Sequence, residues 1–154
     1  MRLFLKNLLW TLVAPGTIAG YVPWWMVRDR ELVLSAWTAA AAVNIVLGVA
    51  IYLWCVWDFA SYGRATPAPI DAPKRLVVRG LYRYVRNPIY VGVLSIILGW
   101  AMLFQAAGVL IYGVCVAAAF HLFVVLYEEP QLARDFGGEY EVYRSRVGRW
   151  IPRL

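Results

Sequence analysis

The sequence predicts an all-α integral membrane protein, a four-transmembrane-helix bundle with a cytoplasmic C-terminal helix. Of the 154 residues, 62% are hydrophobic, and the mean hydropathy is +0.62, whereas soluble domains are nearer ~45–50% apolar. The apolar residues form long runs that short charged segments separate. Such runs are typical of membrane spans, and the chain length suits one compact bundle without a second domain.

Four apolar runs are candidates for these spans. In chain order they cover residues 5–27, 32–59, 89–104 and 109–127. The second run is longer than a ~30 Å hydrocarbon core at ~1.5 Å per residue, so we expect it to tilt or to protrude. Pro15-Gly16 should kink the first run, which also lacks the small-residue cleavage site of a signal peptide. Only Gln105 and small residues separate the last two runs, which predicts a tight helical hairpin.

Lysine and arginine are distributed unevenly over the connections between these runs. They gather in the N-terminus, in the loop between the second and third runs, and in the C-terminal tail, whereas residues 28–31 are balanced and the hairpin turn carries no charge. An even number of spans puts the three basic segments on one side, the cytoplasmic one. We therefore expect both termini in the cytoplasm. A bacterial or archaeal inner membrane is the expected location, because the chain is short and carries no retrieval signal.

Several other classes of protein do not fit the sequence. The net charge of +6 could indicate a nucleic-acid partner, but the arginines flank apolar spans, so membrane orientation explains them and we expect no nucleic acid. Cys55 and Cys115 lie inside apolar runs, where buried small hydrophobes are the expectation. With one histidine, His121, and no Cys-x-x-Cys, no metal cluster is predicted. Glycine-rich nucleotide-binding motifs are absent as well.

Two segments outside the spans have readable patterns. Three prolines between Gly63 and Lys74 predict an extended loop. In the tail, apolar residues recur at spacings of four, four, three and four, which predicts a helix against the cytoplasmic face of the bundle, although Gly137-Gly138 weakens it. These residues are Leu132, Phe136, Tyr140, Tyr143 and Val147. A helix that merely lies on the membrane surface is the alternative.

Two polar motifs carry the chemistry, and both should lie on the cytoplasmic side. One is the segment 80–92, and the other is Glu128-Glu129-Pro130, which we expect at the end of the fourth span. Adjacent carboxylates at a helix C-terminus and at the membrane boundary are costly, so a cationic group should meet them. Either a ligand or an ion-pair network with Arg83 and Arg86 could meet that need.

The dipeptide Asn87-Pro88 predicts the start of the third span, because asparagine caps helices and proline favours the first turn. The same helix N-terminus could hold an anion while the glutamate pair holds an ammonium group. A zwitterion such as the methionine end of S-adenosylmethionine would suit both, as would other zwitterions. If the fourth helix continues past Tyr127, His121 and Glu128 share one face. His121 alone is more typical of a packing residue.

The second half of the chain resembles the isoprenylcysteine carboxyl methyltransferase family and its relatives, the phosphatidylethanolamine N-methyltransferases. The resemblance covers roughly Pro67 to Pro152 and rests on the order and spacing of short motifs. They are Leu76-Val77, Gly80-x-Tyr82, Arg86-Asn87-Pro88-x-Tyr90-x-Gly92, Glu128-Glu129, Phe136-Gly137-x-x-Tyr140-x-x-Tyr143 and the ending Val147 to Pro152. The first two spans match by hydropathy only.

This resemblance implies one methyltransferase domain, with two N-terminal spans in residues 1–62 and a cofactor-binding half in residues 63–154. It implies that this half binds S-adenosyl-L-methionine at the cytoplasmic face, while a lipid or lipophilic acceptor enters from the bilayer. The implied cofactor residues are Lys74, Arg75, Leu76, Val77, Tyr82, Asn87, Pro88, Ile89, Tyr90 and Glu128. If the nucleophile needs a base, His121 and Glu129 are the candidates.

The chain departs from the carboxyl methyltransferases at two positions. Asn87 stands where they have histidine, and Val124 stands where they have an arginine that meets the substrate carboxylate. Methyl transfer is therefore a better-supported expectation than a prenylcysteine acceptor. Two alternatives stay open: an NADPH-dependent membrane reductase of the sterol-reductase type, and a non-enzymatic membrane scaffold. The glutamate pair favours the methyltransferase over the reductase.

Overall fold

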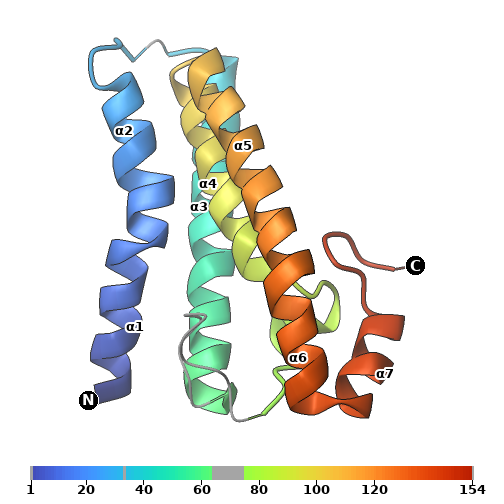
Figure 1. The fold of residues 1–154 in the computed structure, drawn as a ribbon. Helices are drawn as coiled ribbons and strands as arrows, with labels where there is room; N and C mark the ends of the chain where they lie inside the picture. Colours follow the sequence, from blue (N-terminus) through green and yellow to red (C-terminus); the bar gives the residue numbers. More distant parts are fainter. Residues whose placement is uncertain (1, 33, 64–74, 154) are drawn as a thin grey trace.

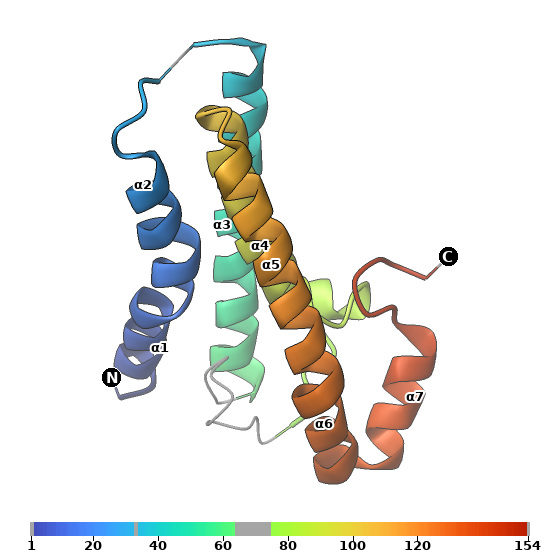
Figure 2. The ribbon, with the colours of Figure 1, turned by 45° about the horizontal axis from the view of Figure 1, so that its top comes forward.

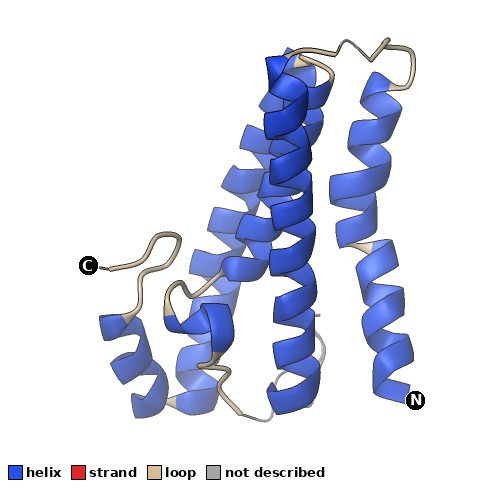
Figure 3. Cartoon of the chain, turned by 180° about the vertical axis from the view of Figure 1, so that it is seen from behind, coloured by secondary structure: helices blue, strands red, loops and turns tan. Residues whose placement is uncertain are grey.

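The computed structural model describes residues 2–32, 34–63 and 75–153, and these form helices and connecting turns (Figures 1 and 3). The α-helices are α1 (Arg2–Val13), α2 (Val22–Val27), α3 (Ala36–Asp58), α4 (Pro88–Leu103), α5 (Ala107–Phe123), α6 (Glu129–Phe136) and α7 (Gly138–Arg146). Within the described ranges there is no strand, only an isolated parallel bridge between Val85 and Gly148. The predicted all-α class is confirmed.

Four short helical segments of other kinds lie among the described residues. Three are π-turns, η1 (Thr17–Tyr21), η2 (Phe59–Gly63) and η4 (Val124–Glu128), and one is a 3-10 turn, η3 (Gly80–Arg83). The N-terminus, α6 and α7 lie at one end of the molecule, called the lower end from its place in Figure 1. The loop after α2 and the α4–α5 turn lie at the opposite, upper end. The predicted extended loop lies outside the described residues.

Two continuous helices are long and apolar enough to cross a membrane. They run over Ala36–Gly63 and Ala107–Phe136, and only 22% and 11% of their most apolar windows are buried inside the protein. A core helix of a soluble protein would hide such a surface, whereas large exposed apolar faces mark contact with a partner or with lipid. The apolar helix α4 is shorter, and the first predicted span is divided into α1, η1 and α2.

Helices α3 and α4 pack antiparallel with their backbones in close contact. A Cβ atom on Gly48 would lie 2.6 Å from the carbonyl oxygen of Gly92, and one on Gly92 would lie 2.9 Å from that of Gly48. Small residues allow this approach, which is a common way to join helices where lipid removes the hydrophobic driving force. The tight α4–α5 hairpin is confirmed: Ala106 donates its N–H to Ala101 O at 2.9 Å, and Gln105 has φ 47°.

The N-terminal helix is interrupted near the predicted kink. α1 ends at Val13, and a π-turn over Thr17–Tyr21 leads into α2. Figures 1 and 2 show this helix as a separate column beside α3, α4 and α5. Its upper part, η1 and α2, packs on α4, whereas α1 makes its main contacts near η2 at the lower end. The upper part of this column is therefore packed more closely on the other helices than the lower part.

The expected end of the fourth span at Glu128-Glu129 was wrong. The helix continues through η4 and α6 to Phe136, and Gly137, with φ 51°, ends it. In the π-turn, Glu129 donates its N–H to the carbonyl oxygen of Val124, five residues earlier. Pro130, which has no N–H to donate, follows directly, and the helix continues past it. The two carboxylates thus lie inside a long helix, and the argument from an unfavourable C-terminal dipole does not apply to them.

The single tail helix was also wrong, because the positive φ at Gly137 turns the chain from α6 into the separate helix α7. The apolar stripe nevertheless packs as one cluster, in which Tyr140, Tyr143 and Val147 join Leu76 and the inner face of α6. The side chain of Tyr140 is only 1% exposed. The predicted position against the bundle is therefore right, and a helix that lies only on a surface is excluded.

Candidate active site

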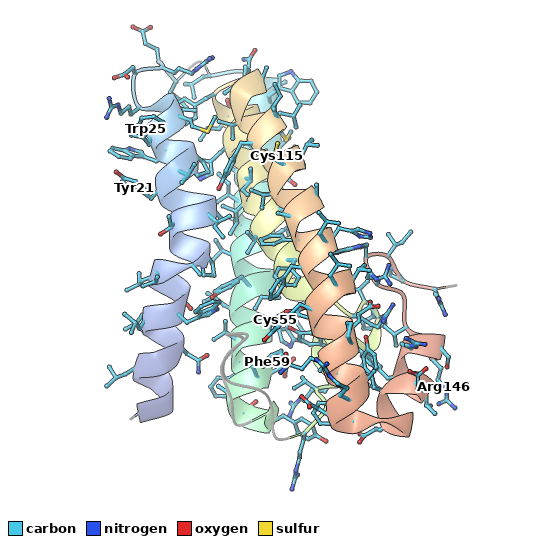
Figure 4. The ribbon with its side chains drawn as sticks, viewed as in Figure 1. Tyr21, Trp25, Cys55, Phe59, Cys115 and Arg146 are labelled. Carbon is cyan, nitrogen blue, oxygen red and sulfur yellow. The ribbon has the colours of Figure 1, made fainter. Side chains whose placement is uncertain are left out.

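A cavity of about 190 Å³ lies between the N-terminal helix and the helices α3, α4, α5 and α6. Its lining comes from both halves of the chain. The lining residues are Trp10, Ala14, Pro15, Ile18, Tyr52, Phe59, Leu76, Val77, Tyr82, Arg86, Asn87, Ile89, Tyr90, Val93, Phe120, Tyr127, Glu128, Gln131, Leu132, Asp135 and Tyr143. Figure 4 labels Phe59, a lining residue in η2, and Cys55 near the lower end of α3.

The cavity has a polar end and an apolar end. The charged and amide side chains of its lining come from the start of α4 and from the η4–α6 segment. The opposite wall comes from the N-terminal helix and carries apolar residues. A ligand that fills the cavity should therefore combine a polar, charged part with an apolar part.

Glu128 lies in the cavity wall and has a hydroxyl group as its partner. Tyr90 donates its Oη to Glu128 Oε1 at 2.5 Å, and the Tyr90 ring packs on Phe120 with centroids 4.5 Å apart. In the described part of the chain, no arginine, lysine or histidine forms an ion pair with Glu128. The cation that the sequence leads us to expect at this carboxylate is therefore not supplied by a described side chain.

The neighbouring Glu129 has a different environment, turned away from the cavity. Arg149 donates two hydrogen bonds to its oxygens at 2.6 and 2.9 Å, and Arg86 Nη1 lies 3.0 Å from Oε1. Arg86 also donates to the hydroxyl of Tyr140 at 3.0 Å. For Glu129, then, an ion-pair network exists that includes Arg86 as predicted, but its second arginine is Arg149 and not Arg83. It ties α6 to the start of α4 and to the tail.

Asn87 occupies the N-cap position of α4, as predicted, but its side chain does not cap the helix. Its Nδ2 instead donates to Arg149 O at 3.1 Å. Pro88 follows as the first helical residue and is buried, while Ile89 and Tyr90 line the cavity. The first turn of α4 therefore borders the cavity without a side-chain acceptor on its N–H groups, which is a favourable position for an anionic group.

Residues 76–83, which include η3, are held at the cavity by two anchors. The first is at Asp58, which is 1% exposed and accepts from Arg79 Nε at 3.1 Å. Gly80, with φ 54°, packs so closely here that a Cβ would collide with Asp58 Oδ2. The second is Tyr143, which donates to Tyr82 O at 2.7 Å. Burial raises the pKa of Tyr143, so its hydroxyl keeps the donated proton.

Most of the sequence-predicted cofactor residues lie together at this cavity. Seven of them line it: Leu76, Val77, Tyr82, Asn87, Ile89, Tyr90 and Glu128. Pro88 is buried beside them, and Arg75 is exposed and does not belong to the lining. Lys74 lies outside the described residues.

The structure does not place either candidate base in the cavity lining. His121 is exposed, and its Nδ1 accepts from Trp150 Nε1 at 3.1 Å. The predicted shared face of His121 and Glu128 was wrong, because the π-turn between them adds one residue per turn and rotates the register by about 100°. Phe120 takes the inward position instead. Val124, where the carboxyl methyltransferases have arginine, is buried outside the lining.

Sequence reasoning did not identify which residues the first half of the chain contributes to the cavity. Trp10, Ala14, Pro15 and Ile18 line the cavity from the N-terminal helix, and Tyr52 and Phe59 do so from α3 and η2. Apolar residues on an apolar helix carry no signal that separates a pocket wall from a lipid-facing surface. Gln131 and Asp135 were missed because the helix was expected to end before them.

Comparison with known proteins agrees with this geometry. The model of the phospholipid methyltransferase family matches residues 36–139. Methanethiol S-methyltransferase 1 of Bradyrhizobium diazoefficiens is 28% identical over 132 residues, which cover 83% of this chain and 45% of that protein. Methanethiol S-methyltransferase 2 of the same organism is 36% identical over 74 residues, 48% of this chain and 27% of that protein. The chain thus spans less than half the length of these relatives.

The family match covers α3 to the start of α7 and includes the whole polar end of the cavity. The apolar helices with outward-facing side chains agree with a membrane protein. The resemblance inferred from the short motifs is confirmed, and the chain belongs to the phospholipid methyltransferase family.

Proposed function

We propose that this protein is an S-adenosyl-L-methionine-dependent methyltransferase that acts on a lipophilic acceptor at the cytoplasmic face of a membrane. The observation that carries the proposal is Glu128. It is a carboxylate in a cavity wall, held by the Tyr90 hydroxyl and lacking a described cationic partner. A ligand ammonium group would supply that partner, and the family match supports methyl transfer.

The residues present fit such a cofactor. Glu128 would hold its ammonium group, and the first turn of α4 would face its carboxylate. The rings of Tyr82 and Tyr90 would lie against the cationic sulfonium. Leu76 and Leu132 offer apolar surface for the remainder. When bound, the cofactor would supply an electrophilic methyl group, so the protein needs chiefly to align the nucleophile and exclude water.

The acceptor end supports a nucleophile that does not rely on a strong base. Glu129 is engaged by Arg86 and Arg149, and His121 does not line the cavity. The role of Glu129 or His121 as a general base therefore stays a prediction. The curated relatives are methanethiol S-methyltransferases by name. A thiol reacts as its thiolate and would release its proton to water, so it needs a weaker base than a hydroxyl does. Membrane lipids with an amine headgroup are the other acceptor class, for which the family is named.

We propose further that the four apolar segments span the membrane as one domain, with both termini in the cytoplasm of a bacterial or archaeal cell. Two observations support this orientation. The N-terminus and the helices α6 and α7, which carry Arg134, Arg144 and Arg146, lie at the same end of the molecule (Figure 1). The described residues of the loop before α4, which include Arg79 and Arg83, lie at that end too.

A binding titration of the purified, detergent-solubilised protein tests the proposal. S-adenosylhomocysteine and NADPH would be titrated in parallel, with thermal stability as a second readout. We expect saturable binding of S-adenosylhomocysteine and none of NADPH. Binding of NADPH alone would overturn the proposal in favour of a reductase, and binding of neither would favour a scaffold. Transfer of labelled methyl to thiols or to phosphatidylethanolamine vesicles then distinguishes the acceptor classes.

A further inference from the structure

The N-terminal helix forms the wall of the cavity opposite Glu128. Trp10, Ala14 and Ile18 line it at spacings of four, so they share one face of the helix. Their neighbours on the same helix, Leu9 and Val13, are largely exposed and point away. One face of this helix therefore closes the cavity while another faces outward.

This wall is uncharged. The charged residues of the described lining are Arg86, Glu128 and Asp135, and they come from the start of α4 and from the η4–α6 segment. The wall itself presents aliphatic and aromatic surface, and Val93 and Phe120 add more from α4 and α5. A buried charge here would lack a partner, so the occupant of this end should be uncharged and apolar.

Two hydrogen bonds hold the wall at a fixed distance from the other helices. Thr11 Oγ1 and Tyr52 Oη are 2.8 Å apart, which joins α1 to α3. Tyr112 of α5 donates its hydroxyl to Ile18 O at 2.9 Å.

The second bond follows from the π-turn. Val22 donates its N–H to Thr17 O, and the next residue, Pro23, has no N–H. The carbonyl oxygen of Ile18 therefore receives no backbone N–H from Val22 or Pro23 and accepts the Tyr112 hydroxyl instead.

The wall also lies outside the part of the chain that the family model matches, which begins at residue 36. The polar end, by contrast, lies within it. The cavity of about 190 Å³ is smaller than the ~300–1,000 Å³ of pockets for drug-sized ligands. Phe120 and Ala14 both line this cavity, so an acceptor that shares it with a cofactor at the polar end would contact the wall.

We propose that Trp10, Ala14 and Ile18 set the size of the methyl acceptor, and that they select an uncharged, short-chain nucleophile. The inference rests on the methyl transfer proposed above and adds the acceptor class to it. Ala14 is the small residue of the set, so added volume there should exclude longer acceptors. Removal of the Trp10 ring should admit them.

The test uses two wall variants and a matched control. Ala14→Phe fills the wall, Trp10→Ala opens it, and Val13→Phe adds a ring to the neighbouring exposed position. The readouts are S-adenosylhomocysteine affinity and kcat/KM for straight-chain thiols of increasing length. We expect Ala14→Phe to lower kcat/KM for the longer thiols at least ~10-fold, the scale of a methylene in an apolar pocket. Trp10→Ala should shift the preference to longer chains, and Val13→Phe should leave the profile unchanged.

Photo-crosslinking gives a readout that does not need turnover. An alkyl thiol with a terminal diazirine should label residues 10–18 of the wild type, and Ala14→Phe should reduce that label while Val13→Phe should not. Labelling at other residues would overturn the proposal that this wall sets acceptor size. An unchanged dependence of kcat/KM on thiol length in both wall variants, with S-adenosylhomocysteine still bound, would overturn it as well. If the wild-type protein does not bind S-adenosylhomocysteine, the proposed function is overturned instead. Labelling at residues 10–18 would in that case still support an apolar binding wall.

Discussion

Tyr90 and Glu128 meet across the cavity, with Tyr90 Oη donating to Glu128 Oε1 at 2.5 Å. The bond joins the first turn of α4 to the π-turn η4, two elements that are 38 residues apart in sequence. It orients a carboxylate toward the cavity without neutralising its charge. The adjacent Glu129, in contrast, is paired with Arg86 and Arg149. Two neighbouring glutamates thus have separate surroundings, one in the cavity wall and one in an ion-pair network.

Replacement of Tyr90 by phenylalanine should weaken S-adenosylhomocysteine binding by about tenfold. The ring and its contact with Phe120 remain, but Glu128 loses a hydrogen bond to its charged group, which is typically worth ~1.5–3 kcal/mol. Titration of the variant measures the effect, and Tyr84→Phe, at an exposed position, serves as control. An unchanged affinity would show that the bond does not orient the binding carboxylate.

Replacement of Glu129 by glutamine should destabilise the fold. The side chains of Arg86 and Glu129 are 9% and 12% exposed, and loss of one partner of such a pair commonly costs ~3–5 kcal/mol because the other charge stays buried. Thermal unfolding in detergent should show a lower midpoint. Glu141→Gln removes an exposed pair with Arg144 and should change the midpoint little. Equal midpoints for the two variants would contradict the structural role of Glu129.

Replacement of Gly80 by alanine should weaken S-adenosylhomocysteine binding as well as stability. A Cβ at this position would collide with Asp58 Oδ2 and lie 2.8 Å from Trp54 Nε1, so the cavity-lining segment must shift. Gly137→Ala has a similar positive φ but no atom within 4 Å of the added Cβ, so it separates backbone strain from the collision. Comparable affinity in both variants would argue against the collision as the cause.

Much of the fold could be predicted because the apolar runs and their basic flanks follow directly from the physics of the bilayer. The hairpin around Gln105 was predicted from the short connection between two apolar runs. The packing of the apolar stripe from Leu132 to Val147 was predicted from its helical spacing, although the stripe lies on two helices and not on one. Many of the residues that line the cavity belong to short motifs with polar members, such as Asn87 and Glu128, which stand out against an apolar background. Their role in cofactor binding stays a prediction.

The rest could not be predicted because it depends on backbone features without a clear sequence signal. The π-turn before Glu129 lets the helix pass Pro130, and it rotates His121 out of the cavity and Phe120 into it. The contribution of Trp10 and Ala14 depends on how the N-terminal helix packs on the other helices. An apolar helix gives the same pattern whether it faces lipid or a cavity.

The most direct test of the central claim is the S-adenosylhomocysteine affinity of Glu128→Gln, compared with that of Glu141→Gln. The glutamine keeps the size of the side chain and a carbonyl acceptor for Tyr90, but removes the charge that would hold an ammonium group. We expect Glu128→Gln to bind at least ~10-fold more weakly, with an unchanged unfolding midpoint, and Glu141→Gln to bind like the wild type. Wild-type affinity in a stable Glu128→Gln protein would contradict the assignment of Glu128 as the cofactor carboxylate.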